Sequence, residues 1–162
     1  MDKITNVFNK IEDILAGMAC VLILLSMLST IAEVFVRYFF NHSFVWIQEY
    51  NEYILLYIPF LAGAWLLRHN GHVAVDLIDM FIGARAKVNL DKIVAIIGII
   101  TTAVIVYASV IVTVDAYREN LISTTILNTP QFYVYIIIPI GTFFIMLEFF
   151  RKLIQAQRKT NN

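Results

Sequence analysis

The sequence predicts an all-α integral membrane protein: one membrane domain, residues 1–162, with four transmembrane helices and an interfacial amphipathic helix between the second and the third. Of the 162 residues, 60% are apolar and 15% are charged, and the mean hydropathy is +0.76. Four uncharged runs approach or reach the about 20 apolar residues that cross a bilayer. The basic residues gather on one side of the topology that these runs imply.

The composition excludes two large classes of protein. About a quarter of the residues in a soluble domain are charged, well above this chain, so a cytosolic enzyme is excluded. Twelve Lys and Arg balance twelve Asp and Glu, whereas a nucleic-acid binder needs a basic surplus for the phosphates. The single cysteine, Cys20, can form neither an intramolecular disulfide nor a cysteine-based metal site.

The four spans follow from the uncharged runs Ile14–Ala32, Tyr53–Leu67, Ile93–Val114 and Phe132–Leu147. Extended to their polar flanks, these runs predict helices over 11–40, 44–68, 91–117 and 131–155. A signal peptide is the alternative for the first run, but its apolar region is too long and no small-x-small cleavage site follows. The segment around Gly17 lacks the branched residue of a lipoprotein box, so Cys20 is predicted to be a buried free thiol in a spanning helix.

Positive charges mark the cytoplasmic side of short loops. With four spans, the termini and the middle loop share one side, which holds Lys3, Lys10, Arg68, Arg85, Lys87, Lys92, Arg151, Lys152, Arg158 and Lys159. The other side holds only Arg37 and Arg118, so both termini are expected in the cytoplasm. Aromatic side chains that favour the interface fall near the outer boundary, namely Tyr38, Trp46, Tyr117, Tyr133 and Tyr135.

The middle loop, Arg68–Leu90, has the pattern of a helix that lies flat in the membrane interface over about residues 72–90. One face is apolar, with Val73, Leu77, Met80, Phe81, Ala84 and Val88. The opposite polar stripe holds His72, Asp76, Asp79, Gly83 and Lys87. An ordinary amphipathic connector explains the same pattern, and the sequence leaves both interpretations open.

Five residues near the outer ends of the first two helices form the candidate site: Glu33, Arg37, Trp46, Glu49 and Glu52. Glu33 precedes Arg37 by four residues, the favourable order for a helical ion pair. The break Asn41–Ser43 is short, so the charged groups of both helices are expected to lie close together. They either dock a partner or bind a coupling ion, or they pin the two helix ends near water, where charge is tolerated. Pinning is the favoured interpretation.

The sequence predicts no enzyme, no cofactor and no metal site. No ionisable residue falls in the middle of a span, which excludes the pattern of a small proton-coupled exchanger. Haem-carrying membrane cytochromes need histidines within the spans, but His42, His69 and His72 fall outside them. His69, His72 and Asp76 supply too few ligands for a closed metal site. A glycine-rich phosphate loop, an activated nucleophile and a nucleotide motif are all missing from the sequence.

A complete transporter within this chain is also unexpected. Transport sites on broken helices usually come in paired inverted repeats, and residues 1–80 and 81–162 share no repeat. Pro59 and Pro139 lie inside the second and fourth helices, where each is expected to bend its helix and shape the packing.

An ordered set of residues links the first two helices to the loop after them. It contains Arg37-Tyr38, Asn41, Ser43, Trp46, Glu49, Tyr53, Gly63-Ala64, Arg68, Gly71-His72 and Val75. This set resembles the small membrane subunit, or DctQ-like Q-subunit, of tripartite ATP-independent periplasmic (TRAP) transporters. Length, span count and topology agree over the whole chain, while the second half agrees in hydropathy alone. Gln48 stands where many members have an acid and Glu52 where many have a base, so the charge pairing at the outer edge is expected to differ.

The resemblance implies a role in importing organic acids, such as C4-dicarboxylates, sialic acid or 2-oxo acids, across the inner membrane of a bacterium or archaeon. In such transporters a periplasmic substrate-binding protein captures the substrate, and a large permease subunit carries it across, driven by a sodium gradient. The Q-subunit is a scaffold on the fixed part of the large subunit and binds neither substrate nor sodium. The implied partners are these two proteins and the lipid bilayer, with no nucleic acid.

Two other classes of function stay open on the sequence. One is a self-contained small membrane transporter or channel with its own ion site at Glu49 and Glu52. The other is a membrane enzyme subunit or quinone-binding anchor, for which the sequence offers no set of ligands.

Overall fold

The computed structural model describes residues 2–69, 84–125 and 127–161. Its helices are α1 (Asp2–Phe40), α2 (Val45–Arg68), α4 (Ala84–Arg118), α5 (Gln131–Tyr135) and α6 (Ile137–Asn161). Within these ranges, β pairing is confined to an isolated bridge between Ile122 and Pro130. The predicted all-α class is therefore confirmed for the described residues.

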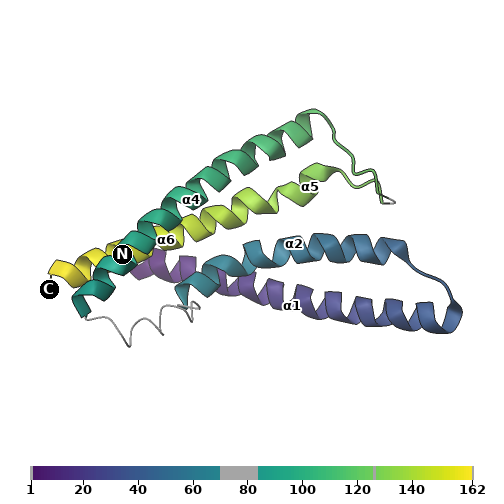
Figure 1. The fold of residues 1–162 in the computed structure, drawn as a ribbon, viewed down its shortest axis with the longest axis horizontal. Helices are drawn as coiled ribbons and strands as arrows, with labels where there is room; N and C mark the ends of the chain where they lie inside the picture. The colour runs from purple at the N-terminus through teal and green to yellow at the C-terminus, as the bar shows by residue number, and fades with distance from the viewer. Residues whose placement is uncertain (1, 70–83, 126, 162) are drawn as a thin grey trace.

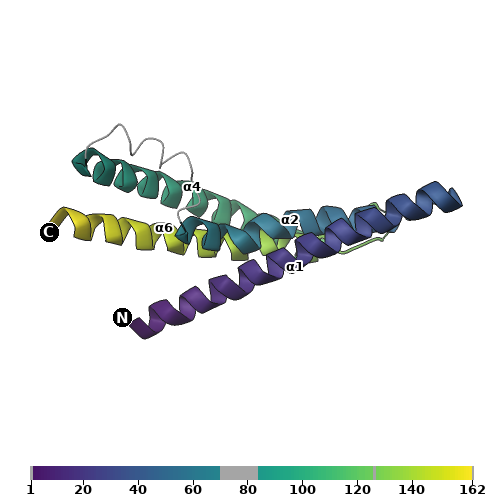
Figure 2. The same ribbon diagram turned by 90° about the horizontal axis from the view of Figure 1, so that it is seen from below.

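The long helices stand side by side in a twisted row, in the order α4, α6, α2 and α1 (Figure 1). The view turned by 90° shows α1 crossing α2 at an angle (Figure 2). Both chain termini lie at one end of the row, which we call the terminal end. The α1–α2 turn and the α4–α5 loop lie at the opposite end, which we call the loop end. Because α1 and α4 form the edges of the row, most of their surface is uncovered.

Each edge helix contacts its neighbour along one narrow stripe. The buried residues at helical spacing are Glu12, Ala16, Ala19 and Glu33 on α1, and Ala95, Thr102, Thr113 and Ala116 on α4. The alanines and threonines among these residues are small and let the helix backbones approach closely, which favours association in a bilayer. The Thr102 hydroxyl donates to the carbonyl of Gly98, and the Thr113 hydroxyl to that of Ser109, both at 2.6 Å. Both hydroxyls are therefore satisfied within their own helix.

Glycines mark the closest contacts between helices: Gly63 faces Ile145, Gly98 faces Phe149 and Gly141 faces Phe60. A Cβ added at Gly141 would lie 2.5 Å from both the carbonyl oxygen and the Cβ of Phe60, so α6 meets the backbone of α2 there. Gly17 differs, because nothing lies within 4 Å of the place where its Cβ would be. The contact at Gly141 joins the two hairpins of the row.

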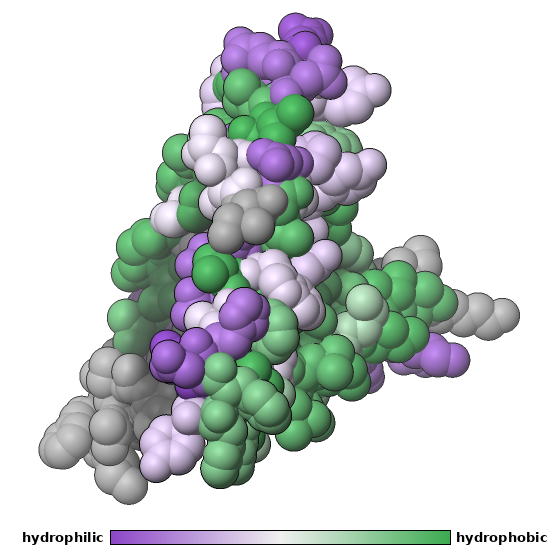
Figure 3. Space-filling model, turned by 90° about the vertical axis from the view of Figure 1, so that its right-hand side faces the viewer, coloured by the Kyte–Doolittle hydropathy of each residue, from purple (hydrophilic) through white to green (hydrophobic). Residues whose placement is uncertain are grey.

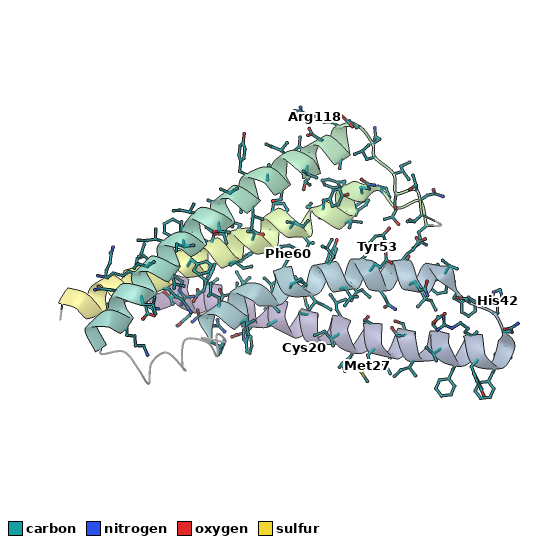
Figure 4. All side chains as sticks on the ribbon, viewed as in Figure 1. Cys20, Met27, His42, Tyr53, Phe60 and Arg118 are labelled. Atoms are coloured by element: carbon teal, nitrogen blue, oxygen red, sulfur yellow. The ribbon has the colours of Figure 1, made fainter. Side chains whose placement is uncertain are left out.

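The apolar core is small and lies where Ala19, Leu61 and Ile137 meet. Most large apolar side chains on α1 and α4 are exposed instead. Cys20 is one of the exposed residues of α1, so the predicted buried thiol is wrong. The contact stripe of α1 is narrow: it includes Ala19 but not the adjacent Cys20. Met27 likewise points away from α2 (Figure 4).

The helix boundaries differ from the predicted ones in three places. α1 begins at Asp2 instead of residue 11, because Lys3 and Lys10 are compatible with a helix that continues beyond the apolar run. α4 already includes residues 84–90, ahead of the predicted start at residue 91, and no glycine or proline interrupts these turns. The last helix is broken at Ile136, between α5 and α6. Pro139 explains the break, because it has no N–H for the carbonyl four residues earlier.

Within the described residues, three segments are long and apolar enough to cross a membrane: Thr5–Phe40, Lys87–Arg118 and Gln131–Gln157. α2, the predicted second span, is not among them, although its 24 residues suffice in length. Its tyrosines, tryptophans, glutamates and Asn51 lower its hydropathy. Hydropathy therefore supports three of the four predicted spans.

We expect Gly141→Ala to lower the free energy of unfolding by about 1–3 kcal/mol, because the new methyl group meets backbone atoms of Phe60 that cannot turn aside. Gly17→Ala is the matched control, and we expect it to change stability by at most about 1 kcal/mol, in the stabilising direction. Thermal unfolding of both variants in the same lipid nanodiscs measures the difference. Equal unfolding temperatures would contradict the close contact between α2 and α6.

Candidate functional site

Glu33 and Arg37 meet on the last turns of α1, at the loop end. The Arg37 Nη2 lies 3.7 Å from Oε2 of Glu33, and the Ser43 hydroxyl donates to Oε1 of Glu33 at 3.1 Å. The side chain of Glu33 is 6% exposed and that of Arg37 is 54% exposed. The carboxylate is thus held between α1 and the turn to α2, while much of the guanidinium remains accessible.

Glu49 contacts a different part of the chain. It is buried near the start of α2, and its Oε2 accepts a hydrogen bond from the Leu127 backbone N–H at 3.1 Å. Leu127 belongs to the loop between α4 and α5, which is closed by hydrogen bonds from Ser123 N to Thr129 O and from Gln131 N to Leu121 O. Glu49 therefore ties α2 to the loop of the other hairpin.

Glu52 and Trp46 are both exposed at the loop end. The Trp46 ring lies edge-on to Tyr50, with centroids 6.1 Å apart, beside an open apolar groove that includes Leu25 and Ile54. Glu49 is buried and Glu52 is exposed, so the two carboxylates have different surroundings. The candidate site therefore contains three kinds of contact: the ion pair of Glu33 with Arg37, the hydrogen bond of Glu49 with the α4–α5 loop, and the exposed side chains of Trp46 and Glu52.

The surface of the loop end is uneven in polarity. In the view onto the loop end, hydrophilic side chains gather over the end of α4, where Arg118 lies, while the lower half combines apolar side chains with a smaller hydrophilic patch (Figure 3; Figure 4). The exposed aromatic residues of the α1–α2 hairpin are Phe35, Tyr38, Phe39, Phe40 and Trp46. Rings of this kind are typical of a membrane interface.

The predicted interfacial helix, residues 72–90, lies largely outside the described residues. His72, Asp76 and Asp79 of its polar stripe fall in the segment that is not described. Lys87 is described, and it belongs to α4. The apolar segment of α4 that is long enough to cross a membrane begins at Lys87.

A second charged cluster, which the sequence analysis missed, lies at the terminal end. Glu12 of α1 is fully buried, and the Nη1 of Arg68 on α2 lies 3.0 Å from its Oε2. The same Nη1 donates a hydrogen bond to the carbonyl of Asn9 at 2.9 Å. The Nη2 of Arg68 pairs with Asp13. One guanidinium thus holds three residues of α1 against α2.

α6 contributes a similar pair to the same region. Arg151 donates a hydrogen bond from Nη1 to Oε2 of Glu148 at 2.8 Å, and the Glu148 side chain is 3% exposed. The Arg151 guanidinium also lies 5.5 Å from the centroid of the Phe8 ring on α1, a cation–π contact. Phe8 in turn packs against Phe144 of α6. We call Asn9, Glu12, Asp13, Arg68, Glu148 and Arg151 the terminal cluster.

Two signals in the sequence could have identified the terminal cluster. Glu12 shares its helix face with Ala16 and Ala19, which predicts that the carboxylate faces the neighbouring helix. Glu148 precedes Arg151 by three residues, a spacing that brings side chains together on a helix. No three His, Cys, Asp or Glu side chains in the described ranges are arranged to hold a metal ion. The terminal cluster is arranged for pairing between helices.

The long apolar helices define an integral membrane protein. A family model described as "Tripartite ATP-independent periplasmic transporters, DctQ component" matches residues 26–159. The chain therefore belongs to the DctQ family, and the resemblance inferred from the sequence is confirmed. This family is a transporter component, not an enzyme family. No curated protein matches the chain at significant similarity.

We expect Arg68→Met to lower the free energy of unfolding by about 2–3 kcal/mol, because it removes two hydrogen bonds from a charged donor and a cation beside the buried Glu12. Arg37→Met is the matched control at the loop end, and we expect a loss of only about 0–1 kcal/mol because Arg37 is largely exposed. Thermal unfolding in nanodiscs compares the two. An Arg68→Met variant as stable as Arg37→Met would mean that the terminal cluster contributes little to the fold.

Proposed function

We propose that this chain is the scaffolding membrane subunit of a sodium-driven TRAP transporter that imports an organic acid. The observation that carries the proposal is the row architecture. The chain buries a small core and leaves large apolar side chains exposed along α1 and α4. Such uncovered helix surfaces fit a subunit that packs against the helices of a larger membrane protein. Membership of a family of transporter components supports that assignment.

We propose α2 as the fourth span, with both termini in the cytoplasm. A helix rises about 1.5 Å per residue, so about 32 Å separate Glu12 from Glu33 and about 29 Å separate Arg68 from Glu49. Both distances approximate a hydrocarbon core about 30 Å thick. α1 and α2 therefore carry their buried charges at matching depths. The basic residues concentrated at the terminal end support a cytoplasmic position for it.

Substrate and sodium binding are assigned to the large permease subunit. Secondary transporters bind substrate near the membrane midplane, usually at broken helices. The buried carboxylates Glu12 and Glu33 lie instead toward the two ends of the span Thr5–Phe40, and the buried Glu148 is paired with Arg151 of its own helix. Glu49, the residue of a hypothetical ion site, already accepts a hydrogen bond from Leu127. These features favour a scaffold over a self-contained transporter.

The loop end is the surface that we assign to the periplasmic substrate-binding protein. Arg37 is half exposed there, beside a carboxylate that is itself held by Ser43. A rim charge of this kind steers the encounter between partners more than it stabilises either one.

We expect the purified chain, reconstituted alone in liposomes with an inward sodium gradient, to accumulate no organic acid above empty vesicles. Uptake is expected when the large subunit and the binding protein are added. The measurement is accumulation of radiolabelled C4-dicarboxylates, sialic acid and 2-oxo acids, with each subunit omitted in turn. Clear accumulation by the single chain would overturn the scaffold assignment.

We expect Arg37→Glu to preserve expression and co-purification with the large subunit but to reduce uptake by about tenfold at low salt, because a reversed rim charge slows association. Arg37→Lys is the matched control that keeps the charge, and its uptake should stay near the wild-type rate. Wild-type uptake by Arg37→Glu would remove Arg37 from the docking surface. Loss of the assembled complex would instead make Arg37 a structural residue.

A further inference from the structure

The break in the last helix separates a packed segment from one that buries little. α6 begins after the break with Ile137, which is 8% exposed and belongs to the apolar core with Ala19 of α1 and Leu61 of α2. On the other side of the break, none of the five residues of α5, Gln131–Tyr135, is buried. A segment with few buried contacts opens at a low cost in free energy. α5 is therefore able to move while α6 stays packed.

α5 is joined to the loop that precedes it, at the loop end (Figure 1). The Gln131 N–H donates a hydrogen bond to the Leu121 carbonyl at 2.9 Å, which closes this loop. Leu127 of the same loop donates from its backbone N–H to Oε2 of Glu49 on α2 at 3.1 Å. We call α5 and this loop, as far as the structure describes it, the loop-end flap.

Tyr57 of α2 extends across the break. Its ring packs against the apolar core, whereas its hydroxyl donates a hydrogen bond to the Tyr133 carbonyl of α5. Tyr133 lies in the last turn of α5, where carbonyls lack a partner within their own helix. In a membrane, carbonyls freed at a helix break are satisfied by neighbouring helices. Tyr57 supplies this donor and so holds the loop-end flap against α2.

A second tyrosine on α2 serves as a comparison. Glu49, Tyr53 and Tyr57 are spaced by four residues and share one face of the helix. Within the described part of the chain, the buried hydroxyl of Tyr53 has no hydrogen-bond partner. Tyr57 thus bonds the loop-end flap through its hydroxyl, and Tyr53, one turn away, does not.

We propose that the loop-end flap is a hinged segment that pivots at Ile136, with the Tyr57 hydroxyl as the latch that keeps it closed against α2. Opening separates Tyr133 from Tyr57 and Leu127 from Glu49 together, because both residues belong to the flap. The ring of Tyr57 stays in the core, so the latch can close again without any repacking of α2 and α6. The loop end then changes shape while the row keeps its helix contacts.

Hydrogen exchange of the Leu127 amide, followed by NMR of the full chain in lipid nanodiscs, tests the latch. This amide is bonded to Glu49 rather than to Tyr57, but it becomes open to exchange whenever the flap opens. We expect Tyr57→Phe to accelerate its exchange by about threefold to tenfold, the factor that corresponds to one lost hydrogen bond. Tyr53→Phe is the matched control and should stay within about twofold of the wild-type rate, because it removes no hydrogen bond.

The amide of His69 at the terminal end, which donates to the Trp65 carbonyl, should exchange at the wild-type rate in both variants. A wild-type rate for Leu127 in Tyr57→Phe would overturn the proposal. Equal acceleration at Leu127 and His69 would also overturn it, because the whole row would then have loosened.

Pro139→Ala tests the pivot. The new N–H can donate to the Tyr135 carbonyl and continue the helix through Ile136, which removes the hinge. In this background we expect Tyr57→Phe to accelerate exchange of the Leu127 amide by less than about twofold, because the two changes act on one motion. Acceleration as large as in the chain with Pro139 would contradict a pivot at Ile136.

Discussion

The constraint on which the rest of this structure depends is the absence of a hydrophobic driving force between helices in a bilayer, where lipid tails are as apolar as leucine. Helices that are uniformly apolar gain little by packing together, so contact has to come from close approach and from polar pairs. The row uses alanines and threonines along α4 and a glycine where α6 meets the backbone of Phe60. These contact stripes are narrow, which explains why most of the surface of α1 and α4 stays uncovered.

Polar contacts between helices add to these contact stripes at both ends of the row. At the terminal end, Arg68 joins α1 to α2 while Arg151 joins α6 to α1. At the loop end, Glu49 joins α2 to the loop of the other hairpin. Between them, the Ser29 hydroxyl donates to the Oδ1 of Asn51 at 2.9 Å. Polar pairs therefore fix the register of helices whose apolar surfaces alone would allow sliding.

Features that depend on neighbours in sequence could be predicted, and those that depend on distant partners could not. The apolar runs indicated every long helix, and the four-residue spacing of Glu33 and Arg37 predicted their proximity. The hydrogen bond of Glu49 with Leu127 could not be predicted, because Leu127 lies 78 residues away in the sequence. The helical continuation of α4 through residues 84–90 was missed because an amphipathic connector and a longer helix have the same periodicity.

The terminal cluster could not be predicted either, because its contacts also join residues that are distant in the sequence. Glu12 lies just outside the first uncharged run, where a charge is ordinary, so its burial was invisible in the hydropathy. Only the packing of α2 and α6 against this turn of α1 makes it a buried group. The break at Ile136 was anticipated as a bend at Pro139.

The length of α1 has a consequence for the membrane itself. Its 39 residues span about 58 Å, nearly twice the thickness of the hydrocarbon core. Its two buried carboxylates determine which part of that length lipid tails can cover, since neither can enter hydrocarbon without its partners. A bilayer thicker than their separation has to thin around the row, and a thinner one has to tilt the helix, each at a fraction of a kcal/mol per Å. Hydrophobic mismatch therefore acts on the angle at which α1 crosses α2. The acyl-chain length of the host lipids becomes one determinant of the shape that the row presents to its neighbours.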